Sequence, residues 1–134
     1  MLVPVFLVEH PHHAASMRLF QQCSRGSAFC AAHSLVETYS TLTRIPLPHR
    51  ATPAQADLFL DNVCQRFDGI GLEAAEYRDA IRQTSIAGIA GGAVYDFLIS
   101  RCALKVKADA LYTWNVQHFS RFGTEFSRMV RIPN

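Results

Sequence analysis

The chain has 134 residues, of which 49% are hydrophobic and 18% are charged, and its formal net charge is +2 at pH 7. This length suits one domain with a sizeable buried core, and the composition excludes an intrinsically disordered chain. The charge balance is too mild either to indicate or to exclude binding to nucleic acid.

The first fifty residues alternate between apolar runs and helical spacing. Residues 2–8 are apolar, but they are too few to span a bilayer and no basic residue precedes them, so we expect a soluble, cytoplasmic protein. Residues 11–23 predict a helix that Gly26 ends, and residues 28–32 predict a short buried strand. Ser34 and Glu37 have the spacing of a capping box, which predicts a helix from Ser34 to about Arg44.

The middle of the chain begins with a loop over residues 45–50, which contain two prolines. Thr52 followed by Pro53 predicts the start of a helix with proline at its first position. The apolar stripe of that helix consists of Ala56, Phe59, Leu60 and Val63. A strand over residues 68–72 and a helix over residues 73–86, with acidic residues in its first turn, are predicted next.

The last third begins with a glycine-rich break over residues 88–92, followed by a long apolar helix over residues 93–106. A strand over residues 110–114, a short helical turn over residues 115–122 and an edge strand over residues 129–132 complete the chain. This alternation of helices and strands predicts a parallel sheet covered by helices on both faces. No linker indicates a second domain.

The four cysteines, Cys23, Cys30, Cys64 and Cys102, form no Cys-x-x-Cys pair, so neither a zinc knuckle nor a disulfide framework is predicted. We expect them to be reduced thiols, most of them buried.

Acidic residues are the most informative side chains, because metal-assisted cleavage of phosphodiesters needs several carboxylates to hold Mg²⁺ or Mn²⁺. Glu37 has two compatible interpretations: it completes the capping box, or it follows the carboxyl end of a parallel strand, where α/β sheets bind ligands. Asp96 lies early in the most apolar helix, between Tyr95 and Phe97. It is either a first-turn acid that the helix dipole favours or a buried carboxylate that needs a cation or strong hydrogen bonds.

Asn115 follows the strand that ends in Thr113 and Trp114, so it caps the next turn, or its neutral amide coordinates a metal ion weakly or positions a metal-bound water. The cluster His10, Pro11, His12 and His13 has no matching Cys or His spacing that would support a zinc site, and we interpret it as an exposed helix entry. His33, His49 and His118 occur singly and are expected to be structural or surface residues. The sequence contains no nucleophile elbow and no phosphate-binding loop.

Four segments taken in order, residues 10–13, 34–39, 91–96 and 111–119, resemble the PIN-domain family, and above all the VapC-like toxins of toxin–antitoxin pairs. The proline-bearing residues 44–48 also fit. The resemblance implies a single domain over residues 1–134 with a three-layer α/β/α, Rossmann-like parallel sheet. It also implies that Glu37 and Asp96 are ligands of Mg²⁺ or Mn²⁺, and that Asn115 completes the site with Thr113 nearby.

The chain departs from the family pattern at its start. The family's first strand, which ends in the leading metal-binding aspartate, should precede a segment like residues 2–8. We therefore expect that the printed start lies inside the gene, or that the strand is missing or replaced by residues 2–8. The composition of residues 2–8 permits a strand, whereas their alignment with the family makes a helix the expectation.

Our leading hypothesis is a metal-dependent endoribonuclease that acts as the toxin of a toxin–antitoxin pair. The alternative is a catalytically impaired PIN-like module that binds an antitoxin or RNA, and a third possibility is an α/β protein in which the acids only cap helices. An antitoxin partner and a homodimer follow from the resemblance alone. The early helices that bear Met17, Leu19 and Phe20 are the expected dimer contact.

Overall fold

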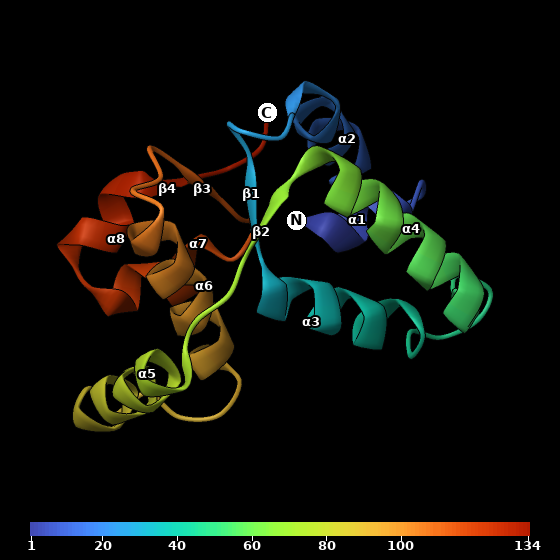
Figure 1. Ribbon diagram of the computed structural model, residues 1–134. Coiled ribbons are helices and arrows are strands. Elements are labelled where there is room, and N and C mark those ends of the chain that lie inside the picture. Colours follow the sequence, from blue (N-terminus) through green and yellow to red (C-terminus); the bar gives the residue numbers. More distant parts are fainter. The chain divides into compact units, whose positions relative to one another are not determined.

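The structure is a computed structural model that describes the backbone of residues 1–134 and every side chain except that of Ser120. The chain forms two compact units (Figure 1). Unit 1 comprises Met1–Gly69 together with Pro133–Asn134, and unit 2 comprises Ile70–Ile132. The single domain predicted for residues 1–134 stays a prediction, because compactness of the parts does not decide whether they unfold together.

Unit 1 is built from four helices and a pair of short strands among its described residues. In chain order these are α1 (Leu2–Phe6), α2 (His13–Gln22), β1 (Phe29–Ala31), α3 (Ala32–Leu42), α4 (Pro53–Arg66) and β2 (Asp68–Ile70), whose last residue opens unit 2. β1 pairs with β2, and the N–H of Asp68 donates to the carbonyl of Ala28 at 2.9 Å. The predicted helices and strands of this half are therefore present.

The start of α4 forms as predicted. The N–H of Gln55 donates to Thr52 Oγ1 at 3.2 Å, and the N–H of Thr52 donates to Gln55 Oε1 at 2.9 Å, so both halves of a capping box are made. The predicted apolar stripe is confirmed, since Ala56 and Val63 are fully buried and Phe59 packs against the core.

Two groups of apolar side chains form the interior of unit 1. The first contains Leu2, Val5, Phe20, Cys30, Val63 and Phe67. The second contains Leu42, Ala51 and Ala56, with Phe6 and Phe59 packed against it. Because Phe20 is buried in the first group and Met17 packs against it, these two side chains face the unit's own core. Homodimerisation itself stays a prediction.

The idea that residues 2–8 replace a strand is wrong, and the helix expected from the family alignment is confirmed. Leu2–Phe6 is the helix α1, and Leu7 follows it with an extended backbone. Pro4 explains the outcome, because proline has no N–H for a sheet ladder yet is tolerated in the first turn of a helix.

The capping box predicted for Ser34 and Glu37 is also wrong. Helix α3 begins at Ala32, its N-cap is Ala31, and no side chain caps it. The strand β1 runs directly into α3, so both residues lie inside the helix, where the carbonyl of Ser34 accepts from Thr38 Oγ1 at 2.7 Å. Glu37 consequently projects from the second turn of α3 and does not close its start.

Unit 2 carries the second run of alternating elements. In chain order these are α5 (Ala74–Ile86), α6 (Ala93–Lys105), β3 (Leu111–Tyr112), α7 (Val116–Phe119), the 3₁₀ turn η1 (Ser120–Phe122), α8 (Thr124–Met129) and β4 (Val130–Arg131). Strands β3 and β4 are parallel, with Leu111 opposite Val130 and Tyr112 opposite Arg131. The predicted α/β class with parallel strands is therefore confirmed, although α8 was not predicted.

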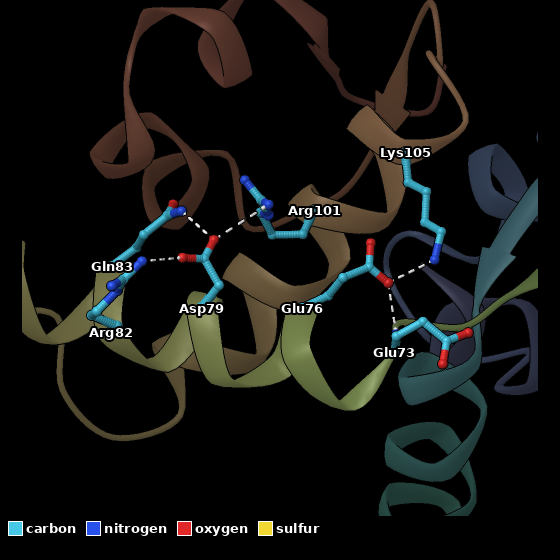
Figure 2. Close-up of polar contacts among 7 residues, drawn as sticks. All are labelled: Glu73, Glu76, Asp79, Arg82, Gln83, Arg101 and Lys105. Carbon is cyan, nitrogen blue, oxygen red and sulfur yellow. Dashed lines mark hydrogen bonds and ion pairs between the residues drawn. The ribbon is translucent and has the colours of Figure 1, made fainter.

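Helix α6 is held against α5 by a polar clasp, which consists of Glu76 and Asp79 of α5 and Arg101 and Lys105 of α6 (Figure 2). Lys105 Nζ of α6 lies 2.7 Å from Glu76 Oε2 of α5 and 3.1 Å from the carbonyl oxygen of Gly71. Asp79 of α5 accepts from Arg82 and Gln83 and lies 3.6 Å from Arg101 of α6. Apolar side chains of the two helices, including Ala80, Phe97 and Leu98, belong to one buried cluster beside this clasp. The position of α6, which carries Asp96, is thus fixed from both polar and apolar sides.

Within the residues that the structure describes, no helix is both long and apolar enough to cross a bilayer.

Candidate active site

Asp96 lies in the first turn of α6, directly after the turn formed by Gly91 and Gly92. Gly91 has a φ of +65°, a backbone conformation that side chains disfavour, so glycine is the suitable residue there. The Asp96 side chain is only 17% exposed, and its Oδ2 lies 2.8 Å from Nδ1 of His118 on α7. The predicted partly buried carboxylate in an apolar helix is therefore present.

The turn between β3 and α7 is held by a series of hydrogen bonds. The N–H of Thr113, a buried residue, donates to the carbonyl of Arg131 at 3.0 Å. Thr113 Oγ1 in turn accepts from the N–H of Asn115 at 3.0 Å. The carbonyl of Asn115 then accepts from the N–H of His118, also at 3.0 Å. Asn115 thus closes the start of α7 with its backbone carbonyl, and the residue is exposed.

These contacts bring three of the four predicted site residues into one connected group within unit 2. Asp96 contacts His118, His118 contacts Asn115, and Asn115 contacts Thr113. The sequence interpretation treated His118 as a structural or surface residue and did not connect it with Asp96. The available signal was its position three residues after Asn115, which places both on a single helical turn.

Glu37 lies in unit 1, on α3. Its side chain is 41% exposed, and its Oε2 lies 3.7 Å from Nε2 of His33, one turn earlier on the same helix. Since Glu37 and Asp96 belong to different units, their predicted meeting in one site stays a prediction.

The donors in unit 2 match a hard divalent cation in type but not in charge. A carboxylate from Asp96, an amide from Asn115 and a hydroxyl from Thr113 are oxygen donors of the kind that Mg²⁺ and Mn²⁺ prefer. Among the described residues of either unit, however, no group of three or more His, Cys, Asp or Glu side chains could hold a metal ion. A magnesium site that includes Asp96 therefore needs a further carboxylate.

The histidines near the N-terminus take structural contacts. His13 Nδ1 lies 2.8 Å from the carbonyl oxygen of Pro4, and His10 Nδ1 accepts from the N–H of His12 at 3.1 Å. Partial burial, followed by the charge of His12, lowers the pKa of His10. These contacts fit the interpretation of the segment as a helix entry.

The chain matches no family model and no solved structure. Among curated proteins it is similar to "Ribonuclease VapC40" of Mycobacterium tuberculosis, found in strains CDC 1551 / Oshkosh and ATCC 25618 / H37Rv. The two sequences are 34% identical over 110 residues, which cover 82% of this chain and 78% of the relative. It is also 33% identical to "Ribonuclease VapC27" of M. tuberculosis H37Rv over 108 residues, which cover 80% and 74% of the two chains.

Proposed function

The chain belongs to the VapC ribonuclease family of PIN-type proteins, and from this premise we propose that it is a metal-dependent endoribonuclease, the toxin of a toxin–antitoxin pair. The observation that carries the proposal is the similarity to two proteins named as ribonucleases over four fifths of the chain. The hydrogen bonds that link Asp96, through His118, with Asn115 and Thr113 support it, because Thr113 and Asn115 follow the carboxyl end of the parallel strand β3.

Asp96 and Glu37 are the proposed carboxylate ligands, with Asn115 and Thr113 as the neutral donors beside Asp96. These residues would hold Mg²⁺ or Mn²⁺, which would supply the positive charge for polarising the scissile phosphate and for activating water. The role of the chain is to supply the negative charge that a hard cation requires. With one carboxylate from each unit, the ligand set carries two negative charges.

The proposed partners are an RNA substrate, a cognate antitoxin and a second copy of the chain. The RNA follows from the named activity of the relatives, and the antitoxin and the homodimer follow from the family resemblance.

The test is cleavage of RNA by the purified full chain with Mg²⁺, with Mn²⁺ or with a chelator. We expect metal-dependent cleavage that is lost in Asp96→Asn and in Glu37→Gln. Matched controls are Asp109→Asn and Asp61→Asn, which alter exposed acids of unit 2 and unit 1 and should leave cleavage unchanged. Cleavage that survives in Asp96→Asn would remove the proposed role of this residue.

The second function is a catalytically impaired module that binds an antitoxin or RNA. The observation that favours it is the shortage of grouped metal ligands among the described residues of either unit. Saturable binding of RNA or antitoxin, without cleavage at any metal concentration, would establish this function in place of the nuclease.

A further inference from the structure

His118 makes a close contact with a carboxylate that the proposed reaction needs. Its Nδ1 lies 2.8 Å from Asp96 Oδ2, and the two residues are 22 positions apart in the sequence. The distance of 2.8 Å between the two atoms is typical of hydrogen bonds to an ionised partner, which are short and about twice as strong as neutral ones. The His118 side chain is half exposed, whereas that of Asp96 is largely buried.

The contact lies at one end of an apolar packing face. Ile99 and Ala103 follow Asp96 at helical spacing along α6, and both pack in the cluster that contains Phe119 of α7. Phe119 is only 1% exposed, so it anchors α7 in the interior of unit 2. His118 is the residue immediately before this anchor, and its own N–H is bound by the carbonyl of Asn115. The backbone of His118 is therefore held by its N–H hydrogen bond to Asn115 and by the buried Phe119 that follows it, and this positions the ring next to Asp96.

The direction of the hydrogen bond follows from the chemistry of the two groups. An ionised carboxylate only accepts hydrogen bonds, so Nδ1 carries the proton and donates to Oδ2. Because a carboxylate has two oxygens, binding of Oδ2 does not prevent Oδ1 from coordinating a cation. A side chain that is fixed at one oxygen also loses less rotational freedom when the other oxygen binds.

We propose that His118 is a positioning residue that holds the Asp96 carboxylate in the orientation for binding a divalent cation. This inference rests on the proposed metal-dependent function and adds a residue to it. His118 acts through Asp96 and does not touch the metal ion.

Two substitutions separate this role from simple packing. Asparagine carries its amide N–H on the atom that corresponds to Nδ1 of histidine, so His118→Asn keeps a donor for Asp96. Glutamine carries its amide one carbon further out, so His118→Gln keeps polarity and size but misplaces the donor. His49 provides a matched control, because its Nδ1 lies 3.6 Å from the carboxylate of Glu9 and both residues belong to unit 1, whereas α6 and α7 belong to unit 2.

The experiment measures Mn²⁺ binding to the purified 134-residue chain by isothermal titration calorimetry, alongside RNA cleavage. Partners that orient a metal ligand typically contribute 10- to 100-fold to metal affinity, so His118→Ala and His118→Gln should weaken Mn²⁺ binding by about 10- to 100-fold. His118→Asn should recover most of the affinity, and His49→Ala should bind Mn²⁺ as the original chain does. Circular dichroism checks that each variant is folded, and the comparison of Asn with Gln stands even if the alanine variant unfolds.

Three results would overturn the inference, and they differ in what else they overturn. Equal Mn²⁺ affinity in the original chain and in His118→Gln, together with loss of binding in Asp96→Asn, removes the role of His118 and leaves the proposed function intact. Equal weakening by Asn and Gln shows that the donor at Nδ1 is not what matters. A chain that binds no Mn²⁺ at all removes the metal-dependent function, and this inference with it.

Discussion

Leu42 provides a test of whether the two units unfold as the single domain predicted from the sequence. It is the last residue of α3, it is fully buried, and it packs with Ala51 and Ala56 in unit 1. The substitution Leu42→Ala removes a buried isobutyl group and leaves a cavity, which costs about 2–5 kcal/mol of the free energy of unfolding. With a urea dependence of about 1–3 kcal/mol per molar, a loss near 3 kcal/mol lowers the midpoint of unfolding by roughly 1–3 M.

The assay follows urea unfolding with two probes. The only tryptophan, Trp114, lies in unit 2, whereas far-ultraviolet circular dichroism reports on the helices of both units. If the chain is one cooperative domain, Leu42→Ala shifts the fluorescence midpoint and the dichroism midpoint together, although the altered residue lies in unit 1. Leu58→Ala is the matched control, because it makes the same chemical change at a side chain that is 65% exposed and should alter stability by less than about 0.5 kcal/mol.

A fluorescence midpoint that stays where it was, while the dichroism transition splits into two steps, would refute the single-domain prediction. The two units would then be independently stable parts of the chain.

Three further predictions concern individual contacts. Thr52→Ala should lower stability by about 0.5–2 kcal/mol in urea unfolding, because it removes the capping oxygen that Gln55 uses, and Thr52→Ser should restore it. The N–H of Gly26, followed by the side chain of Arg25, holds the pKa of Asp68 below its usual 3.8. The stability that Asp68 contributes is therefore complete above pH 3.8 and is lost as the pH falls through the lower folded pKa. The deficit of Asp68→Asn should accordingly be full at neutral pH and shrink in acid, and a constant deficit would contradict this assignment. Phe119→Ala should cost about 3–5 kcal/mol by the same urea method. It should also weaken Mn²⁺ binding in the fraction that remains folded, because α7 loses the buried side chain that fixes His118 next to Asp96.

The features that were predicted correctly depend on local signals. Thr52, Pro53 and Gln55 specify the start of α4 within four consecutive residues, and the structure places the helix start there. The apolar stripe of the same helix repeats at helical spacing and is buried as expected.

The features that were missed depend on contacts between distant segments. Ser34 and Glu37 have the local pattern of a helix start, but β1 leads straight into α3 and the helix begins earlier. Helix α8 has no clear apolar period, and its Phe126 is buried against Phe97 of α6. The contact between His118 and Asp96 joins two elements that no spacing in the sequence relates. Local chemistry therefore located the elements and the acids, whereas the partner of Asp96 required the three-dimensional structure.

The proposed ligand set, with one carboxylate in each unit, would link metal binding to the folding of both units. Asp96 is held within unit 2, because its carboxylate contacts His118 of α7 and its helix α6 packs against α5. Glu37 belongs to unit 1, and one carboxylate alone provides little charge to hold a hard cation. Metal binding that needs both residues therefore needs both units folded together, and a ligand that binds only this state stabilises both units. Mn²⁺ should thus raise the fluorescence and dichroism midpoints equally in the original chain, and it should raise neither in Glu37→Gln. If Mn²⁺ stabilises the Glu37→Gln variant as strongly as the original chain, the second carboxylate comes from another residue.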